Sequence, residues 1–166
     1  MPDEQLSLKT SKTQVGRKVR QSESRGGVSA EIKKSNYIAN EKKQLVKNKA
    51  EIDKNISKKE FIVIDARSKD RFEGKVTEPR KGLRSGSIKN SFCLPYSDLI
   101  NPDRTFVNND KILEKFKSIK CDLNKNLTFS CGSGITASVL ALAYSLIDNK
   151  YNPTIYDGSW SEYGKF

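Results

Sequence analysis

The sequence predicts an α/β domain with a central, mainly parallel sheet flanked by helices, preceded by a basic tail. Two observations lead to this prediction. Short apolar, β-branched runs alternate with helical patterns, and the aromatic residues gather in the last two thirds of the 166-residue chain. Of the fourteen aromatic residues, only Tyr37 lies within residues 1–60. Strands that alternate with helices are joined by right-handed crossovers, which make neighbouring strands parallel.

Residues 1–36 form the predicted tail. They are rich in Lys, Arg, Ser and Thr and contain a Gly-Gly pair, so they offer too little apolar surface to offset the entropy of ordering. We therefore expect a disordered basic segment over residues 1–36 and a folded domain over residues 37–166. A mitochondrial transit peptide is the alternative for this N-terminus, but Asp3, Glu4 and Glu23 argue against that alternative.

The first half of the predicted domain contains one helix and two strands. Residues 40–56 carry apolar side chains among good helix formers, which predicts a short amphipathic helix. The apolar run 61–64 predicts a strand that is buried on both faces, and the polar segment 65–67 should lie at the edge of the sheet. Residues 91–94, closed by Pro95, predict a second short strand.

The second half continues the alternation. Residues 109–119 have apolar side chains at helical spacing and predict an amphipathic helix. Residues 127–130 predict a third strand, and the almost wholly apolar segment 136–147 predicts a buried helix. Residues 154–156 predict a fourth strand, which completes the sheet.

Composition excludes several classes of function. The chain has no histidine, so Ser-His-Asp triads, Cys-His dyads and most catalytic zinc sites lack a base or a ligand, and we expect no metal. Three cysteines without CxxC spacing predict free thiols, which favours a reducing compartment. No apolar run reaches the roughly 18–20 residues of a membrane span, and no apolar signal segment is visible. We therefore expect a cytoplasmic protein without a membrane partner.

The net charge of +11 raises nucleic-acid binding as a further hypothesis. The basic residues of the tail lack interleaved aromatic residues, and no RNA-binding motif accompanies them. A solvated basic tail therefore explains the charge better, and nucleic acid is not an expected partner.

The segment with the most chemical information is LTFSCGSGITASV, residues 127–139. It places Cys131 at the carboxyl end of a predicted strand, before a loop with two glycines and a helix that begins near Thr136. Ligands of open α/β sheets bind at this edge. Loop N–H groups and the positive end of the helix dipole would stabilise a thiolate there. Gly132 and Gly134 give the loop its backbone freedom, and Thr136 can cap the helix.

The sequence argues against two classes of cysteine enzyme. A cysteine-based phosphatase needs a Cys-x5-Arg signature to bind phosphate, but Ala137 stands at the arginine position. A cysteine protease needs a histidine base, which the chain lacks. The other two thiols, Cys93 and Cys121, are expected to be buried small side chains without a chemical role.

The CGSGIT loop, residues 131–136, resembles the active-site loop of the rhodanese-type sulfurtransferases, and most of all the CGSGVT loop of the 3-mercaptopyruvate sulfurtransferases. Residues 65–84 are similar to the DAR, RF.G and EPR.G.R motifs of that family's second domain. Residues 156–164, YDGSWSEYG, are similar to its C-terminal motif. The resemblance covers residues 37–166 and implies a rhodanese-like domain.

This resemblance implies a sulfurtransferase. Sulfane sulfur would move from 3-mercaptopyruvate, or less readily from thiosulfate, to a thiol, a thioredoxin-like protein or cyanide through a persulfide on Cys131. No cofactor is implied beyond this covalent intermediate. The uncharged loop favours mercaptopyruvate over thiosulfate as the donor.

The resemblance also implies roles for individual residues. Ser133 would polarise the donor or relay a proton, and Arg71 and Arg80 match the positions that anchor the donor's carboxylate, for which the guanidinium fork is suited. Surface ion pairs are the alternative for the two arginines. The residues that follow Cys131 would form the loop that holds the persulfide anion. These are Gly132, Ser133, Gly134, Ile135 and Thr136.

The chain also departs from the family. Members normally carry two such domains with the active site between them, and this chain has room only for the second, so the first-domain aspartate that supports the loop serine has no counterpart. Residues 85–90 replace the usual Gly-His-Ile-Pro-Gly turn, with Ser87 at the histidine and Lys89 at the proline. The alternative function is therefore a non-catalytic or partner-dependent binding module. We expect the face that a first domain would cover to mediate association.

Overall fold

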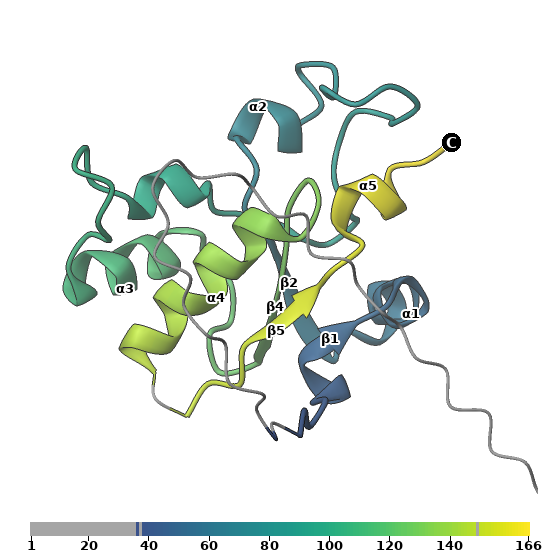
Figure 1. Ribbon diagram of the computed structural model, residues 1–166. Coiled ribbons are helices and arrows are strands. Elements are labelled where there is room, and N and C mark those ends of the chain that lie inside the picture. Colours follow the sequence, from purple (N-terminus) through teal and green to yellow (C-terminus); the bar gives the residue numbers. More distant parts are fainter. Residues whose placement is uncertain (1–35, 37, 149) are drawn as a thin grey trace, which may run out of the picture. The chain divides into compact units, whose positions relative to one another are not determined.

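The computed structural model describes residues 36, 38–148 and 150–166 (Figure 1). The chain divides into two units, Met1–Ala39 and Asn40–Phe166, and the described helices and strands all lie in the second unit. Apart from Asn36, which is exposed, the tail predicted over residues 1–36 lies outside the described residues.

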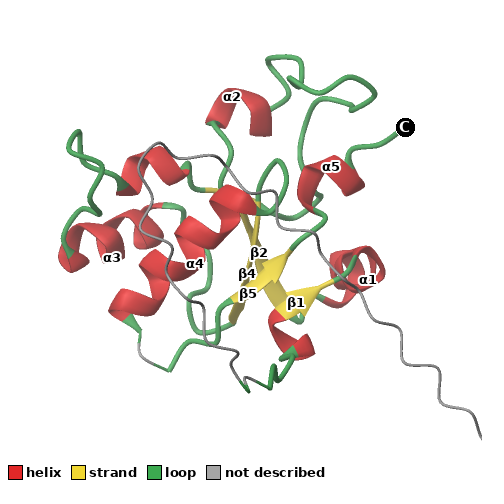
Figure 2. Cartoon of the chain, viewed as in Figure 1, coloured by secondary structure: helices red, strands yellow, loops and turns green. Residues whose placement is uncertain are grey.

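The second unit is built around a five-stranded sheet with the strand order β1-β5-β4-β2-β3 (Figure 2). Every pair of neighbouring strands is parallel, which confirms the predicted parallel sheet. The strands are β1 (Val46–Lys47), β2 (Phe61–Asp65), β3 (Phe92–Cys93), β4 (Asn126–Ser130) and β5 (Thr154–Tyr156). Strand β4 is central, so the loop that follows it lies in the middle of the carboxyl edge.

Helices cover both faces of this sheet, with α3 and α4 on one side and α1 on the other (Figure 2). The α-helices are α1 (Lys49–Lys58), α2 (Lys69–Phe72), α3 (Asn109–Ser118), α4 (Ile135–Ile147) and α5 (Ser159–Tyr163). Two short 3₁₀ helices are η1 (Lys43–Leu45) and η2 (Tyr96–Leu99). The α/β class predicted from the sequence is therefore confirmed.

Successive residues of strand β2 face opposite layers, as the pleat of a strand requires. Ile64 packs in the larger apolar cluster with Phe116 of α3, whereas Val63 packs in the smaller one with Ile52 of α1 and Trp160 of α5. The larger cluster contains Cys131, and the smaller one contains Trp160, whose backbone N–H donates to the Cys131 carbonyl at 2.9 Å. The surroundings of Cys131 are therefore continuous with the packed core.

The helix predicted over residues 40–56 is wrong in its first half. Residues 43–45 form η1, residues 46–47 form the edge strand β1, and α1 begins only at Lys49. A capping box fixes this start: the Glu51 N–H donates to Asn48 Oδ1 at 3.0 Å, and the Asn48 N–H donates to Glu51 Oε2 at 3.0 Å. Pairing with β5 outweighs the weak helical propensity of the residues before this cap.

Candidate active site

Cys131 directly follows the central strand β4, at the carboxyl edge of the sheet. Leu127, Phe129 and Cys131 all pack in the cluster between the sheet and helix α4, so Cys131 continues the side-chain alternation of the strand. Only 2% of its surface is exposed. The strand, loop and helix that the sequence predicts around this cysteine are present.

Helix α4 begins at Ile135, and its N-cap is Gly134 with a φ of 82° and no side-chain cap. The prediction that Thr136 caps the helix is therefore wrong. A Cβ atom on Gly134 would lie 2.9 Å from Oδ1 of Asp157, so both the left-handed backbone and the close packing require glycine here. The hydroxyl of Thr136 instead acts on Cys131, where it helps to lower the pKa of the thiol.

Hydrogen-bond donors of the loop surround the sulfur of Cys131. The N–H of Ser133 donates to Sγ at 3.4 Å, and the backbone N–H groups of Thr136 and Ala137 also act to lower the pKa of the thiol. Burial by itself raises the pKa of the Cys131 thiol, but these hydrogen bonds outweigh burial and bring the pKa below its ordinary value. The loop therefore favours the thiolate, which is the nucleophilic form.

The other two cysteines have different surroundings. Cys93 and Cys121 are free and half-buried rather than fully buried. Burial raises the pKa of Cys93 to about 12 and also raises the pKa of Cys121. Both thiols are therefore protonated near neutral pH, and of the three cysteines only Cys131 has surroundings that favour the anion.

A cleft of about 330 Å³ opens beside Cys131, between its loop and the segment that includes and follows helix α2. The cleft brings together all of the site residues predicted from the sequence except Gly134, which is buried. Its lining consists of Arg71, Glu78, Pro79, Arg80, Leu83, Cys131, Gly132, Ser133, Ile135 and Thr136. The buried sulfur of Cys131 thus faces a cleft that two arginines line.

Arg71 from helix α2 is held in this cleft by Glu78. Its Nη2 donates to Glu78 Oε2 at 2.5 Å and its Nε donates to Oε1 at 3.2 Å, and this pairing raises the pKa of Arg71. A Cβ atom on Gly132 would lie 3.2 Å from Nη2, so the glycine leaves room for the guanidinium. Arg71 therefore has both of the features considered from the sequence: it forms an ion pair and it lines the cleft. Arg80 is exposed.

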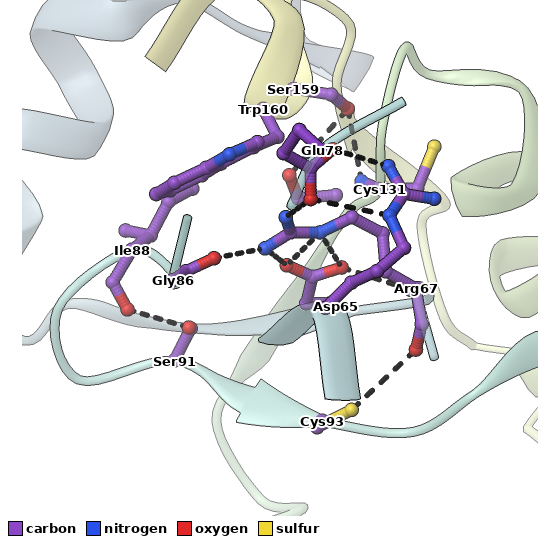
Figure 3. A network of polar contacts seen from close by, with 12 residues as sticks. Asp65, Arg67, Glu78, Gly86, Ile88, Ser91, Cys93, Cys131, Ser159 and Trp160 are labelled. Atoms are coloured by element: carbon purple, nitrogen blue, oxygen red, sulfur yellow. Dashed lines mark hydrogen bonds and ion pairs between the residues drawn. The ribbon is translucent and has the colours of Figure 1, made fainter. Parts of the chain in front are cut away.

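A buried network of charged side chains holds Glu78 in position (Figure 3). Arg67 is 2% exposed and donates from Nη1 to Glu78 Oε1 at 2.8 Å, from Nη2 to Asp65 Oδ2 at 2.7 Å and from Nη2 to the Gly86 carbonyl at 2.8 Å. Its guanidinium carbon lies 4.6 Å from the centre of the Trp160 ring. Through Glu78, this network fixes the position of Arg71.

Asp65, Arg67 and Glu78 lie within the motifs that resemble the family, but no role in a site was predicted for them. A signal was nevertheless present, because Asp65 and Arg67 come at the end of the apolar run 61–64. A charged side chain next to a buried strand is itself expected to be buried, and it then needs a partner of opposite charge, since an unpaired buried charge is strongly unfavourable. Glu78, eleven residues beyond Arg67, is that partner.

Among the described residues, no three His, Cys, Asp or Glu side chains come close enough together to hold a metal ion. None of their helices combines the length and the apolar character needed to cross a membrane.

Comparison with known proteins gives a consistent family. The family described as Rhodanese-like domain matches residues 48–165. The chain is 41% identical over 100 residues to thiosulfate/3-mercaptopyruvate sulfurtransferase 1, mitochondrial, from Arabidopsis thaliana, covering 60% of this chain and 26% of that one. It is 36% identical over 118 residues to human 3-mercaptopyruvate sulfurtransferase, covering 71% and 39% of the two chains.

Solved structures give the same result. The crystal structure of Tum1 from Saccharomyces cerevisiae has a TM-score of 0.65 at 30% identity and covers 72% of this chain and 43% of that one. The 3-mercaptopyruvate sulfotransferase SseA from Escherichia coli has a TM-score of 0.65 at 28% identity, with coverage of 80% and 48%. This chain therefore spans less than half the length of the proteins that it resembles here.

Proposed function

Because the chain belongs to the rhodanese-like domain family, we propose that it is a sulfurtransferase that moves a sulfane sulfur from 3-mercaptopyruvate to an acceptor through a persulfide on Cys131. The observation that carries this proposal is the set of N–H and hydroxyl donors around the Cys131 sulfur, in a cleft with two arginines. The names of the relatives from Arabidopsis thaliana and Homo sapiens support the same donor.

In the first half-reaction, the thiolate of Cys131 attacks the sulfur of 3-mercaptopyruvate. A bond forms between the two sulfurs while the carbon–sulfur bond of the donor breaks, and its electron pair leaves as the enolate of pyruvate. The proton of the donor's thiol balances the step by moving to the enolate carbon, which releases pyruvate. Ser133, which lines the cleft, is our candidate to polarise the donor or to relay this proton.

The persulfide formed in this way is an anion beside the loop of residues 132–136. The same N–H groups that favour the thiolate would stabilise it, because they need no reorganisation when the charge moves outward by one sulfur atom. In the second half-reaction, an acceptor thiolate attacks the outer sulfur and restores the Cys131 thiolate. Small thiols, a thioredoxin-like protein and cyanide are the acceptors that this chemistry admits.

Arg71 and Arg80 are our candidates for anchoring the donor's carboxylate. Glu78 uses the Nε and Nη2 donors of Arg71, and we assign the Nη1 donors to the substrate. Thiosulfate remains the second donor to test, since the Arabidopsis relative is named for both. A reducing compartment suits three free thiols, so we propose the cytoplasm, with the mitochondrion as the alternative that the Arabidopsis name suggests.

The test is the intact mass of the purified chain after brief exposure to 3-mercaptopyruvate, with pyruvate release followed in the same sample. We expect a mass gain of one sulfur atom and an equivalent amount of pyruvate. Exposure to thiosulfate in parallel ranks the two donors. A folded sample that gains no sulfur from either donor would overturn independent catalysis and favour a binding module that needs a partner.

The carboxylate anchor is tested with Arg71→Gln. Loss of a charge-assisted contact should raise the KM for 3-mercaptopyruvate roughly ten- to a hundredfold with a smaller change in kcat. The matched control is Lys75→Gln, which removes the same charge from an exposed neighbour that pairs with Glu73 on the surface. Steady-state pyruvate release measures both variants. Equal changes in KM for the two would show only a general effect of charge and contradict a direct contact.

A further inference from the structure

The residue that organises the Cys131 loop lies outside it, in the segment that follows strand β5. Ser159 is the first residue of α5, is fully buried, and is not among the described residues that line the cleft. Its backbone φ is 49°, in the left-handed region that residues other than glycine, asparagine and aspartate seldom adopt. Such a conformation persists only where the surrounding contacts enforce it, and it often marks a functional position.

The hydroxyl of Ser159 binds both ends of the loop. It accepts hydrogen bonds from the N–H of Cys131 at 3.0 Å and from the N–H of Gly134 at 3.1 Å. It donates its own proton to the carbonyl of Tyr156 at 2.8 Å. Because a hydroxyl has one proton to donate and two lone pairs, these three contacts use its full capacity.

The next two residues of the same segment bind the loop carbonyls. The N–H of Trp160 donates to the Cys131 carbonyl at 2.9 Å, and the N–H of Ser161 donates to the Gly132 carbonyl at 2.9 Å. The loop groups that Ser159 and its neighbours bind are therefore different from those that face the sulfur. The N–H groups of Cys131 and Gly134 donate to Ser159, whereas the N–H of Ser133, which lies between them in the chain, donates to Sγ.

We propose that Ser159 is a positioning residue for Cys131: its hydroxyl fixes residues 131 and 134, and thereby aims the remaining loop N–H groups at the sulfur. The inference extends the proposed function, because the same N–H groups would hold the persulfide. Ser159 does not line the donor cleft, and the three hydrogen bonds described above all join its hydroxyl to backbone groups, so its effect on the sulfur passes through the loop. The contact with Ser130 Oγ, at 3.5 Å, is too long to replace these hydrogen bonds.

The test is the pH dependence of alkylation of Cys131 by iodoacetamide, followed by peptide mass spectrometry. For Ser159→Ala we expect the midpoint to rise by roughly one pH unit, which slows alkylation at neutral pH about tenfold. Ser159→Gly removes the same hydroxyl but tolerates the positive φ, so it should show the same shift with a smaller loss of thermal stability. The charged groups of the cleft, which are Arg71 with Glu78 and Arg80, and Asp157 beside Gly134 are unchanged in both variants.

Ser161→Ala is the matched control, because its hydroxyl donates only to the Gly158 carbonyl and its backbone N–H remains. We expect its alkylation profile to coincide with that of the wild type. A merely structural role predicts that Ser159→Ala and Ser159→Gly melt at lower temperature but keep the wild-type midpoint, and that result would overturn the proposal. Alkylation needs no sulfur donor, so this test decides the role of Ser159 even if the chain takes up no sulfur. If the chain does take up sulfur, kcat for pyruvate release should fall in Ser159→Ala and Ser159→Gly, while the KM for 3-mercaptopyruvate stays unchanged.

Discussion

Cys131→Ser is expected to abolish sulfur uptake. A serine hydroxyl cannot form the persulfide, and the chain has no histidine that could deprotonate it. Pyruvate release from 3-mercaptopyruvate should fall by roughly a thousandfold or more, as removal of a nucleophile does in other covalent mechanisms. Intact mass and pyruvate measured in the same sample give the two readouts, and neither a gain of sulfur nor product should appear.

The other two cysteines serve as controls for this result. Cys93→Ser and Cys121→Ser change the same atom in surroundings that raise the thiol pKa, so both should keep sulfur uptake within about twofold of the wild type. Circular dichroism should show that all three variants are folded. Uptake that survives in Cys131→Ser, or disappears in Cys93→Ser, would contradict the assignment of Cys131.

Arg67→Met is expected to cause the largest loss of stability among single changes in the site. The substitution leaves Asp65 buried at 1% exposure without its cation and removes one of the two partners of Glu78. Breaking a buried ion pair from one side costs about 3–5 kcal/mol. For a domain of this size, that loss lowers the melting temperature by roughly 10–20 °C. Thermal and urea denaturation measure it.

Arg84→Met is the matched control for Arg67→Met. Arg84 also lies over the Trp160 ring, with its guanidinium carbon 5.3 Å from the ring centre, but it is exposed, and its polar contact is with the Tyr163 carbonyl. Its loss should cost about 1 kcal/mol or less. If the two variants lost equal stability, stacking on Trp160 rather than the buried charges would explain the effect of Arg67.

Much of the fold could be predicted because its signals are local. The runs that became β2 and β4 and the apolar segment that became α4 encode their structure in the spacing of their apolar residues, with boundaries correct to within a residue. The junction between β4 and α4, which exposes Cys131 to loop N–H groups, follows from the same local pattern. Only the resemblance predicted that Arg71 and Arg80 would lie near Cys131. The spacing of these residues along the chain does not indicate that they are close in space.

The sequence by itself determined the class of the fold, the order of its main elements and the position of Cys131 after a buried strand. Only the tertiary structure decided which side chains support that cysteine. Ser159 reaches the loop across the pairing of β4 with β5, 28 residues along the chain, and Glu78 meets Arg67 and Arg71 through a segment without regular structure. Apolar periodicity encodes which face of an element is buried, whereas a single hydrogen bond between distant residues depends on how the elements pack. For the same reason the edge strand β1, which exists only through its pairing with β5, was mistaken for part of a helix.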